Sequence, residues 1–276
     1  MGLRIFRPSP HLAPYVSAIW DYDDLLGGEN SVPSILPDTA MYLCFLYAEP
    51  LTTRHRDRVF TTRSGLAGFQ SFRSDLGGRG NVSGVSARLT PWGLNVFRRG
   101  IVSDCAESRI DCRFIFHKYT VEKIEDQLAR QRTPEERVRY VEQFLLSVLE
   151  PDQEDCLIQA ACRVLDRTHG NYPVAKLARA LGTTARTLER RFHAHVGATP
   201  KKYARVVRLR HAVLQRQRLA SWADVAYSAG YYDQSHMVNE FQELYGLTPE
   251  KLHPRMQSSP TFRFSGLLDL YQPSSS

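Results

Sequence analysis

The chain has 276 residues, a length that favours two domains, and 42% of its residues are apolar, which suffices for hydrophobic cores. Its five cysteines are odd in number and form no C-x-x-C pair, which argues against a zinc site and a disulfide framework. No run approaches the roughly 18 apolar residues of a membrane span, which argues against a membrane protein. Residues 155–256 hold 16 Lys and Arg against 8 Asp and Glu, a net charge of +8. Residues 1–154 hold 19 Lys and Arg against 20 Asp and Glu, a net charge of −1. We therefore expect only the second half of the chain to bind a polyanion.

The first part of the chain, up to about residue 117, carries short apolar and aromatic runs separated by turn signals such as Gly27-Gly28 and Pro37-Asp38. Spacing of this kind predicts an antiparallel β barrel or sandwich. The expected strands cover residues 16–20, 41–47, 66–72, 82–89 and 113–116.

Two helices are expected to follow this β-rich part. The first covers residues 121–128. The second begins at Thr133-Pro134-Glu135-Glu136, where a capping box coincides with proline at the first helical position, and extends to residue 149. Its apolar stripe is wide enough for both a core and a dimer partner.

A polar, helix-breaking segment at residues 151–155 marks the expected domain boundary. The sequence therefore predicts an α+β protein with a β-rich regulatory domain over residues 1–150 and an all-α domain over residues 151–256. Residues 257–276 form a Ser- and Pro-rich tail.

The all-α part contains the same pattern twice. The first copy is Leu177-Ala178 … Gly182 … Leu188 … Phe192 … Gly197 … Pro200, and the second is Val225-Ala226 … Gly230 … Met237 … Phe241 … Gly246 … Pro249. Each copy predicts a helix, a turn at glycine, and a second helix whose apolar residues recur at i and i+4. This is the form of a helix-turn-helix, whose second helix enters the major groove of DNA.

The second helix of each copy has a buried and an exposed face. In the first copy Thr184 is the expected N-cap, and Leu188 and Phe192 point inward; in the second, Asp233 is the N-cap. The residues left to read bases are Arg186, Thr187, Glu189 and Arg190 in the first copy and Gln234, Ser235, His236 and Asn239 in the second. Arginine pairs with guanine, glutamate accepts from cytosine, and glutamine and asparagine favour adenine.

Between the copies, residues 201–217 are expected to form one linker helix. Such a helix spans roughly 25 Å and would hold two reading helices about one DNA turn apart. The residues expected to contact phosphates, which position a protein without reading sequence, are Thr184, Lys201, Lys202 and Arg205.

The two copies and their linker resemble, over about residues 155–256, the DNA-binding domain of AraC-type (AraC/XylS) transcriptional regulators. The residues that carry this resemblance include Thr187-Leu188-Glu189-Arg190-Arg191-Phe192, Gly197-Ala198-Thr199-Pro200, Asp224-Val225-Ala226, Gly230-Tyr231 and Thr248-Pro249. The resemblance implies seven helices and base contacts from both reading helices. Asn239 departs from the pattern, because the family often has a basic residue there.

The N-terminal part is similar, more loosely, to a poorly characterised sensor-like domain of some AraC-type regulators. The matching residues are Tyr15-Val16, Trp20, Ile35-Leu36-Pro37-Asp38, Gly65, Gly68 and Leu89-Thr90-Pro91-Trp92-Gly93. Better-known members have a cupin-like barrel and a helical dimer surface, which we take as an analogy.

We therefore predict a cytoplasmic, sequence-specific DNA-binding regulator, either activator or repressor, with double-stranded operator or promoter DNA as its partner. Control is expected through a small-molecule effector, whose binding residues are unknown, or through a homodimer, and RNA polymerase is a further expected partner. No catalytic residues, metal site, cofactor or membrane contact is predicted. His11, His55 and His117 are too scattered for catalysis or metal binding.

Two alternatives remain open. A thiol-responsive regulator would use Cys105, Cys112, Cys156 or Cys162. A structural DNA binder would depend weakly on sequence, whereas a regulator has a large ratio of specific to nonspecific affinity.

Overall fold

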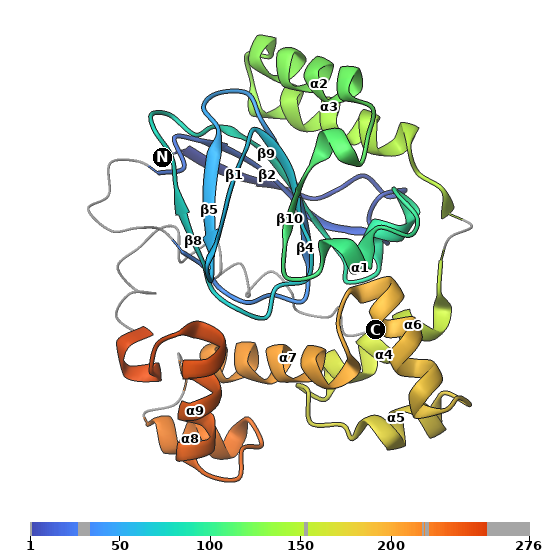
Figure 1. The fold of residues 1–276 in the computed structure, drawn as a ribbon, viewed down its shortest axis with the longest axis vertical. Helices are drawn as coiled ribbons and strands as arrows, with labels where there is room; N and C mark the ends of the chain where they lie inside the picture. Colours follow the sequence, from blue (N-terminus) through green and yellow to red (C-terminus); the bar gives the residue numbers. More distant parts are fainter. Residues whose placement is uncertain (1, 27–33, 152–153, 217, 219–220, 253–276) are drawn as a thin grey trace.

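The computed structural model describes residues 2–26, 34–151, 154–216, 218 and 221–252. Two β-sheets with attached helices form the N-terminal part, and the remaining helices lie along one side of it (Figure 1). The predicted tail at residues 257–276 lies outside the described residues.

The strands form two antiparallel sheets. The larger has the order β1(Gly2–Phe6)-β2(Val16–Asp23)-β9(Gly84–Leu89)-β4(Met41–Leu46)-β7(Ser64–Ala67)-β10(Arg109–Asp111). The smaller has the order β3(Ser34–Ile35)-β8(Ser74–Gly77)-β5(Leu51–His55)-β6(Arg58–Thr62). Within the described residues the sheets share no strand, so of the two predicted alternatives the fold is two sheets and not a closed barrel.

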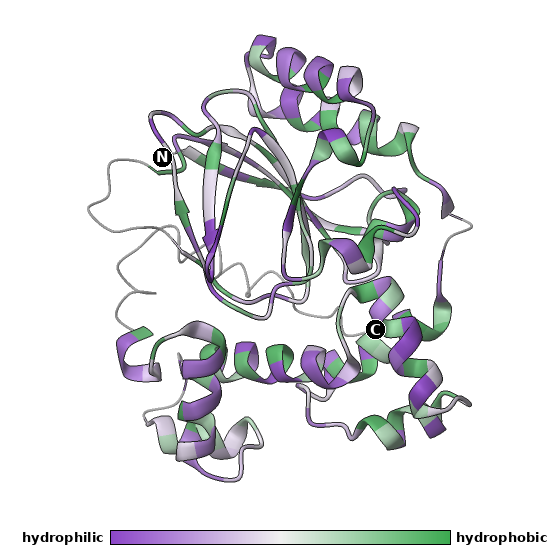
Figure 2. Ribbon diagram, in the orientation of Figure 1, coloured by the Kyte–Doolittle hydropathy of each residue, from purple (hydrophilic) through white to green (hydrophobic). Residues whose placement is uncertain are grey.

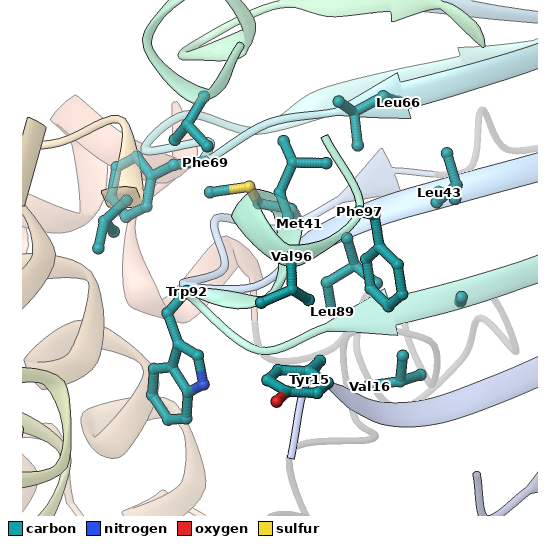
Figure 3. Packing of buried hydrophobic residues seen from close by; sticks show 14 of the residues in the cluster. Tyr15, Val16, Met41, Leu43, Leu66, Phe69, Leu89, Trp92, Val96 and Phe97 are labelled. Atoms are coloured by element: carbon teal, nitrogen blue, oxygen red, sulfur yellow. The ribbon is translucent and has the colours of Figure 1, made fainter. Parts of the chain in front are cut away.

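The larger sheet buries both of its faces. One face carries Leu43, Leu66 and Val85, which belong to the main hydrophobic cluster together with side chains from α1(Val102–Cys105), α2(Lys118–Arg130), α3(Pro134–Ser147) and the short helix η1(Gly93–Val96). Figure 3 shows part of this packing around Met41, Val96 and Phe97. Because side chains alternate along a strand, the other face carries Trp20 and Tyr22, which cluster with Leu51 and Leu76 of the smaller sheet.

The predicted start of α3 is confirmed. Thr133 and Glu136 form the capping box, and Pro134 is the first helical residue. The apolar stripe of α3 packs within the chain: Phe144 forms edge contacts with Phe45 and Phe116, at ring-centre distances of 5.6 and 5.0 Å. Within α3, Leu146 is the large apolar side chain that stays exposed.

The C-terminal part consists of helices. They are α4(Cys156–Arg167), α5(Val174–Ala180), α6(Ala185–Val196), α7(Pro200–Gln215), α8(Trp222–Ser228) and α9(Gln234–Tyr245), and residues 249–252 are again helical. The pairs α5–α6 and α8–α9 lie at opposite ends of α7 (Figure 1). Hydrophilic and hydrophobic residues alternate along these helices, as expected for amphipathic helices (Figure 2).

The two predicted N-caps of the reading helices are confirmed. The Thr184 side chain accepts a hydrogen bond from the Thr187 amide, and the Asp233 side chain accepts one from the His236 amide. Gly230 has a φ of +75°, and a Cβ there would lie 2.7 Å from the Asn171 side-chain amide. Asn171 Nδ2 donates to the Ala229 carbonyl at 3.0 Å, so this glycine lets the loop before α5 contact the second helix-turn-helix.

The prediction of a strand at 113–116 is wrong. Residues Cys112–Phe114 form a short 3-10 helix, because the Asp111 carboxylate accepts from the Arg113 amide and closes a turn. The strand predicted at 66–72 corresponds to β7, which ends at Ala67.

The two parts of the chain share one hydrophobic core. The main cluster continues from the sheet through α4 and α6 to α7, and the rings of Phe69 and Tyr203 stack across the junction with centres 6.4 Å apart. Among the residues that the structure describes, no helix combines the length and apolar character needed to span a membrane.

Candidate nucleic-acid interface

Helix α6 presents a free polar face. Arg186, Glu189 and Arg190 are exposed, and their side chains form no hydrogen bond or ion pair within the described part of the chain. On the opposite side Leu188 and Phe192 are fully buried. These three charged side chains are therefore available to a partner.

The start of α6 is occupied by its own cap. Thr184 Oγ1 accepts from the Thr187 amide at 3.2 Å and lies 3.0 Å from Thr187 Oγ1. Thr187 is half-buried, whereas Thr184 is exposed. Of the residues predicted to read bases, Thr187 is the one whose hydroxyl already has a partner.

Arg191 lies on a different side of α6. Its Nε donates to Asp155 at 2.8 Å, and the same carboxylate caps α4 and lies 3.3 Å from His195 Nε2. Arg191 therefore fixes α6 against α4.

Helix α9 presents the second polar face. Met237 and Phe241 are fully buried, and the Trp222 ring packs edge-on against Phe241 with centres 5.7 Å apart. The residues predicted to read bases from this helix are all exposed, namely Gln234, Ser235, His236 and Asn239.

A groove of about 830 Å³ runs between α9, the start of α5 and one side of α7. It brings together Lys201 and Arg205, predicted to contact phosphates, with His236 and Asn239, predicted to read bases. The predicted base-reading residues of α6 do not line this groove. The two reading faces are thus separate surfaces joined by α7.

A buried carboxylate organises this groove. Glu240 is 4% exposed and accepts from Arg205 Nε at 2.6 Å, Arg208 Nη2 at 3.1 Å and Tyr231 Oη at 2.6 Å. Burial acts to raise the Glu240 pKa, but the hydrogen bonds from Tyr231 and Arg205 outweigh it and lower that pKa. Arg205 also forms an ion pair with Glu243, so its charge is largely compensated inside the protein.

Lys202 points to the N-terminal part instead. Its Nζ lies 2.7 Å from Glu107 Oε1 and 5.4 Å from the Phe72 ring centre. Of the residues predicted to contact phosphates, Thr184 and Lys201 are exposed, whereas Lys202 and Arg205 are held in ion pairs. A phosphate contact from either of these two has to compete with a carboxylate.

The sequence did not reveal the charged link between the two parts. Asp38 accepts from Arg88 Nη2 at 2.9 Å and from the Arg210 guanidinium of α7. Burial acts to raise the Asp38 pKa, but Arg210 and Arg88 outweigh it and hold the pKa below its usual range. The Ile35-Leu36-Pro37-Asp38 motif marked this position, yet nothing in the motif indicates a partner 172 residues away.

The family comparison matches this helical part. The family described as "Helix-turn-helix domain" matches residues 177–255. The HTH-type transcriptional regulator GlxA of Rhizobium meliloti is 36% identical over 116 residues, which cover 41% of this chain and 32% of that protein. The chain therefore spans about a third of the length of this relative.

Two solved structures are similar to this chain. ToxT from Vibrio cholerae has a TM-score of 0.46 and 10% identity, covering 91% of this chain and 96% of that one. An AraC-type regulator from Chromobacterium violaceum has a TM-score of 0.35 and 21% identity, covering 38% of this chain and 94% of that one.

The residues matched by the helix-turn-helix family include both capped reading helices and the linker helix between them. The chain therefore carries a helix-turn-helix domain over residues 177–255, and it is similar over 116 residues to an HTH-type transcriptional regulator.

Proposed function

We propose that this protein is a sequence-specific DNA-binding regulator whose N-terminal part controls DNA binding in response to a small ligand. The proposal of DNA binding is supported by the two N-capped helices α6 and α9. They lie at opposite ends of α7 and have exposed polar faces. Helix α7 has 16 residues and is about 24 Å long, which suits two successive major-groove segments.

The chemistry of the α6 face fits direct base readout. Arg190 and Arg186 carry guanidinium groups that can donate two hydrogen bonds to the guanine edge, and Glu189 can accept from cytosine. Lys201 is exposed at the start of α7, where it fits a phosphate contact.

The experiment compares Arg190→Ala with Lys201→Ala on the full chain. Arg190→Ala should weaken specific binding by about 1–3 kcal/mol and relax the base preference at one position. Lys201→Ala should weaken specific and nonspecific binding alike. It should also reduce the slope of the logarithm of the binding constant against the logarithm of the salt concentration by about one. An equal loss on all sequences for Arg190→Ala would show that this residue does not read a base.

The proposed control rests on direct contacts between the N-terminal part and all three functional helices. Asn95 Nδ2 donates to the His195 carbonyl of α6 at 3.1 Å, Glu107 pairs with Lys202 of α7, and the Arg73 amide donates to the Leu244 carbonyl of α9 at 3.0 Å. A ligand that changes the N-terminal part can thereby change the placement of both reading helices.

The cysteines favour a ligand over a thiol signal. Burial raises the pKa of Cys105 to about 12, and burial also raises the pKa of Cys112 and of Cys162. Reactive cysteines need an accessible thiolate. Cys156 is exposed, so iodoacetamide labelling is expected at Cys156 and not at the three buried thiols.

A homodimer, contact with RNA polymerase and a cytoplasmic location belong to the same proposal. The apolar stripe of α3 is used by the chain's own core, so a dimer through α3 has to use its outer surface, near Leu146. Sedimentation of the full chain tests the dimer, and a monomer at high concentration would refute it.

A further inference from the structure

A cavity of about 70 Å³ lies on the side of the larger sheet that faces the smaller one. Its walls are mainly apolar and include the rings of Trp20, Tyr22 and Tyr42 with Leu51 and Leu76. The strand register explains why a cavity is present here. Trp20, Ser86 and Cys44 are aligned across β2, β9 and β4, and the two small side chains leave room beside the large rings.

One wall of this cavity contains a buried cation for which the described residues supply no counter-ion. Arg109 is 7% exposed, and its side chain forms no hydrogen bond or ion pair with any residue in the described ranges. The groups that face it are Cys44, Tyr22 and Tyr42, and burial raises the pKa of each of them, so all three are neutral near pH 7. Burial lowers the pKa of Arg109 itself, but a guanidinium remains charged in proteins.

The carboxylate in the cavity wall is already occupied. Among the residues that line the cavity, Asp38 is the acid, and it is shared by Arg88 and Arg210. A buried charge is strongly unfavourable unless a counter-charge and hydrogen bonds compensate it. Arg88 has such a counter-charge in Asp38, whereas Arg109 has none among the residues that the structure describes.

We propose that this cavity binds a compact organic monocarboxylate with an apolar body, held by Arg109. A carboxylate fits the planar guanidinium through two parallel hydrogen bonds and supplies the missing negative charge. The apolar walls fit a short aliphatic body, and the volume limits its size, since about 70 Å³ is less than half of the roughly 150 Å³ of a cavity that accepts benzene. This inference rests on the proposed ligand control and names the ligand class.

The position of the site also explains how ligand binding would affect helices α7 and α9. Tyr245 of α9 and Arg210 of α7 belong to the cavity wall. A carboxylate at Arg109 lies beside the Asp38–Arg210 ion pair, which joins the larger sheet to the linker helix. The occupied cavity therefore favours one placement of α7 and α9.

The test measures melting temperatures of the full chain with acetate and propionate, each paired with its neutral amide, at constant ionic strength. The acids should raise the melting temperature, and the amides should not. Arg109→Met should abolish the effect of the acids and weaken their binding at least about tenfold, because it removes a charge-assisted hydrogen bond. Without ligand, Arg109→Met should melt at or above the unmodified chain, since it removes an uncompensated buried charge.

Arg88→Met is the matched control, because it removes a buried arginine that has a partner, and it should lower the melting temperature. The proposal is overturned if neither acid acts more strongly than its amide, if the acids act equally on Arg109→Met, or if Arg109→Met without ligand melts lower than the unmodified chain. The readout contains no DNA, so these outcomes leave the DNA-binding proposal intact. Loss of specific DNA binding, in turn, leaves the carboxylate site intact.

Discussion

At the scale of single residues, Asp166 of α4 offers a test of the buried electrostatics. Tyr203 Oη donates to its carboxylate at 3.0 and 3.2 Å, yet burial outweighs this hydrogen bond and raises the Asp166 pKa to about 6. A carboxyl group whose pKa is raised on folding destabilises the fold once it ionises. Stability is therefore lost as the pH rises from the unfolded pKa near 4 towards 6.

Asp166→Asn should remove this penalty while keeping an acceptor for Tyr203. We expect the variant to be more stable than the unmodified chain at pH 8, by on the order of 1–3 kcal/mol, and the difference to vanish near pH 4. Urea unfolding at both pH values measures it. A variant that is less stable at pH 8 would mean that the ionised carboxylate stabilises the fold.

Residue-level prediction from the sequence succeeded where the interaction is local. Thr184 and Asp233 could be assigned as caps because their partners lie three residues away. It failed for Glu240 and Asp38, whose arginine partners are 32 or more residues distant. Long-range ion pairs leave no pattern in a single sequence.

At the scale of elements, the two faces of α6 predict different consequences of substitution. Phe192 is fully buried, and its ring packs edge-on against Tyr203 at 5.4 Å between centres. Phe192→Ala should therefore cost about 3–5 kcal/mol of stability. Arg190→Ala, on the exposed face, should leave the melting temperature nearly unchanged.

Thermal melts of the two full-length variants make this comparison. An unchanged melting temperature for Phe192→Ala would mean that the inner and outer faces of α6 are reversed.

The amphipathic helices could be predicted because apolar residues recur with a helical period over ten or more residues. Several strands could not. β5 and β6 are short and rich in threonine and arginine, and β10 has three residues at the edge of the larger sheet. Their pairing partners define them more than their own composition does.

At the scale of the whole molecule, the two reading faces differ in charge. The α6 face offers free side chains of Arg186 and Arg190, whereas the α9 face is largely uncharged, and the nearby Glu240 is buried in ion pairs. Charge-assisted hydrogen bonds are roughly twice as strong as neutral ones. We therefore expect α6 to contribute most of the affinity for DNA.

Matched scrambles of each half-site, measured at one salt concentration, test this ranking. Scrambling the half-site bound by α6 should cost more than scrambling the one bound by α9. Equal costs would show that the charge difference between the helices does not set their contributions.

The shared core between the sheets and α7 was not predicted. The sequence indicated two regions of opposite character, but the contacts that join them, such as Phe69 with Tyr203 and Asp38 with Arg210, connect residues more than a hundred positions apart. Helix α7 consequently contacts both helix-turn-helix pairs and the N-terminal part.

The proposed function requires that the full chain reads a DNA sequence. Its most direct test is the ratio of affinities for an operator fragment, found by genome-wide binding-site mapping, and for a scrambled fragment of equal length and composition at fixed physiological salt. We predict a ratio of about 1,000 or more, as expected for a regulator. A ratio near one would contradict the claim and identify the protein as a sequence-tolerant DNA binder.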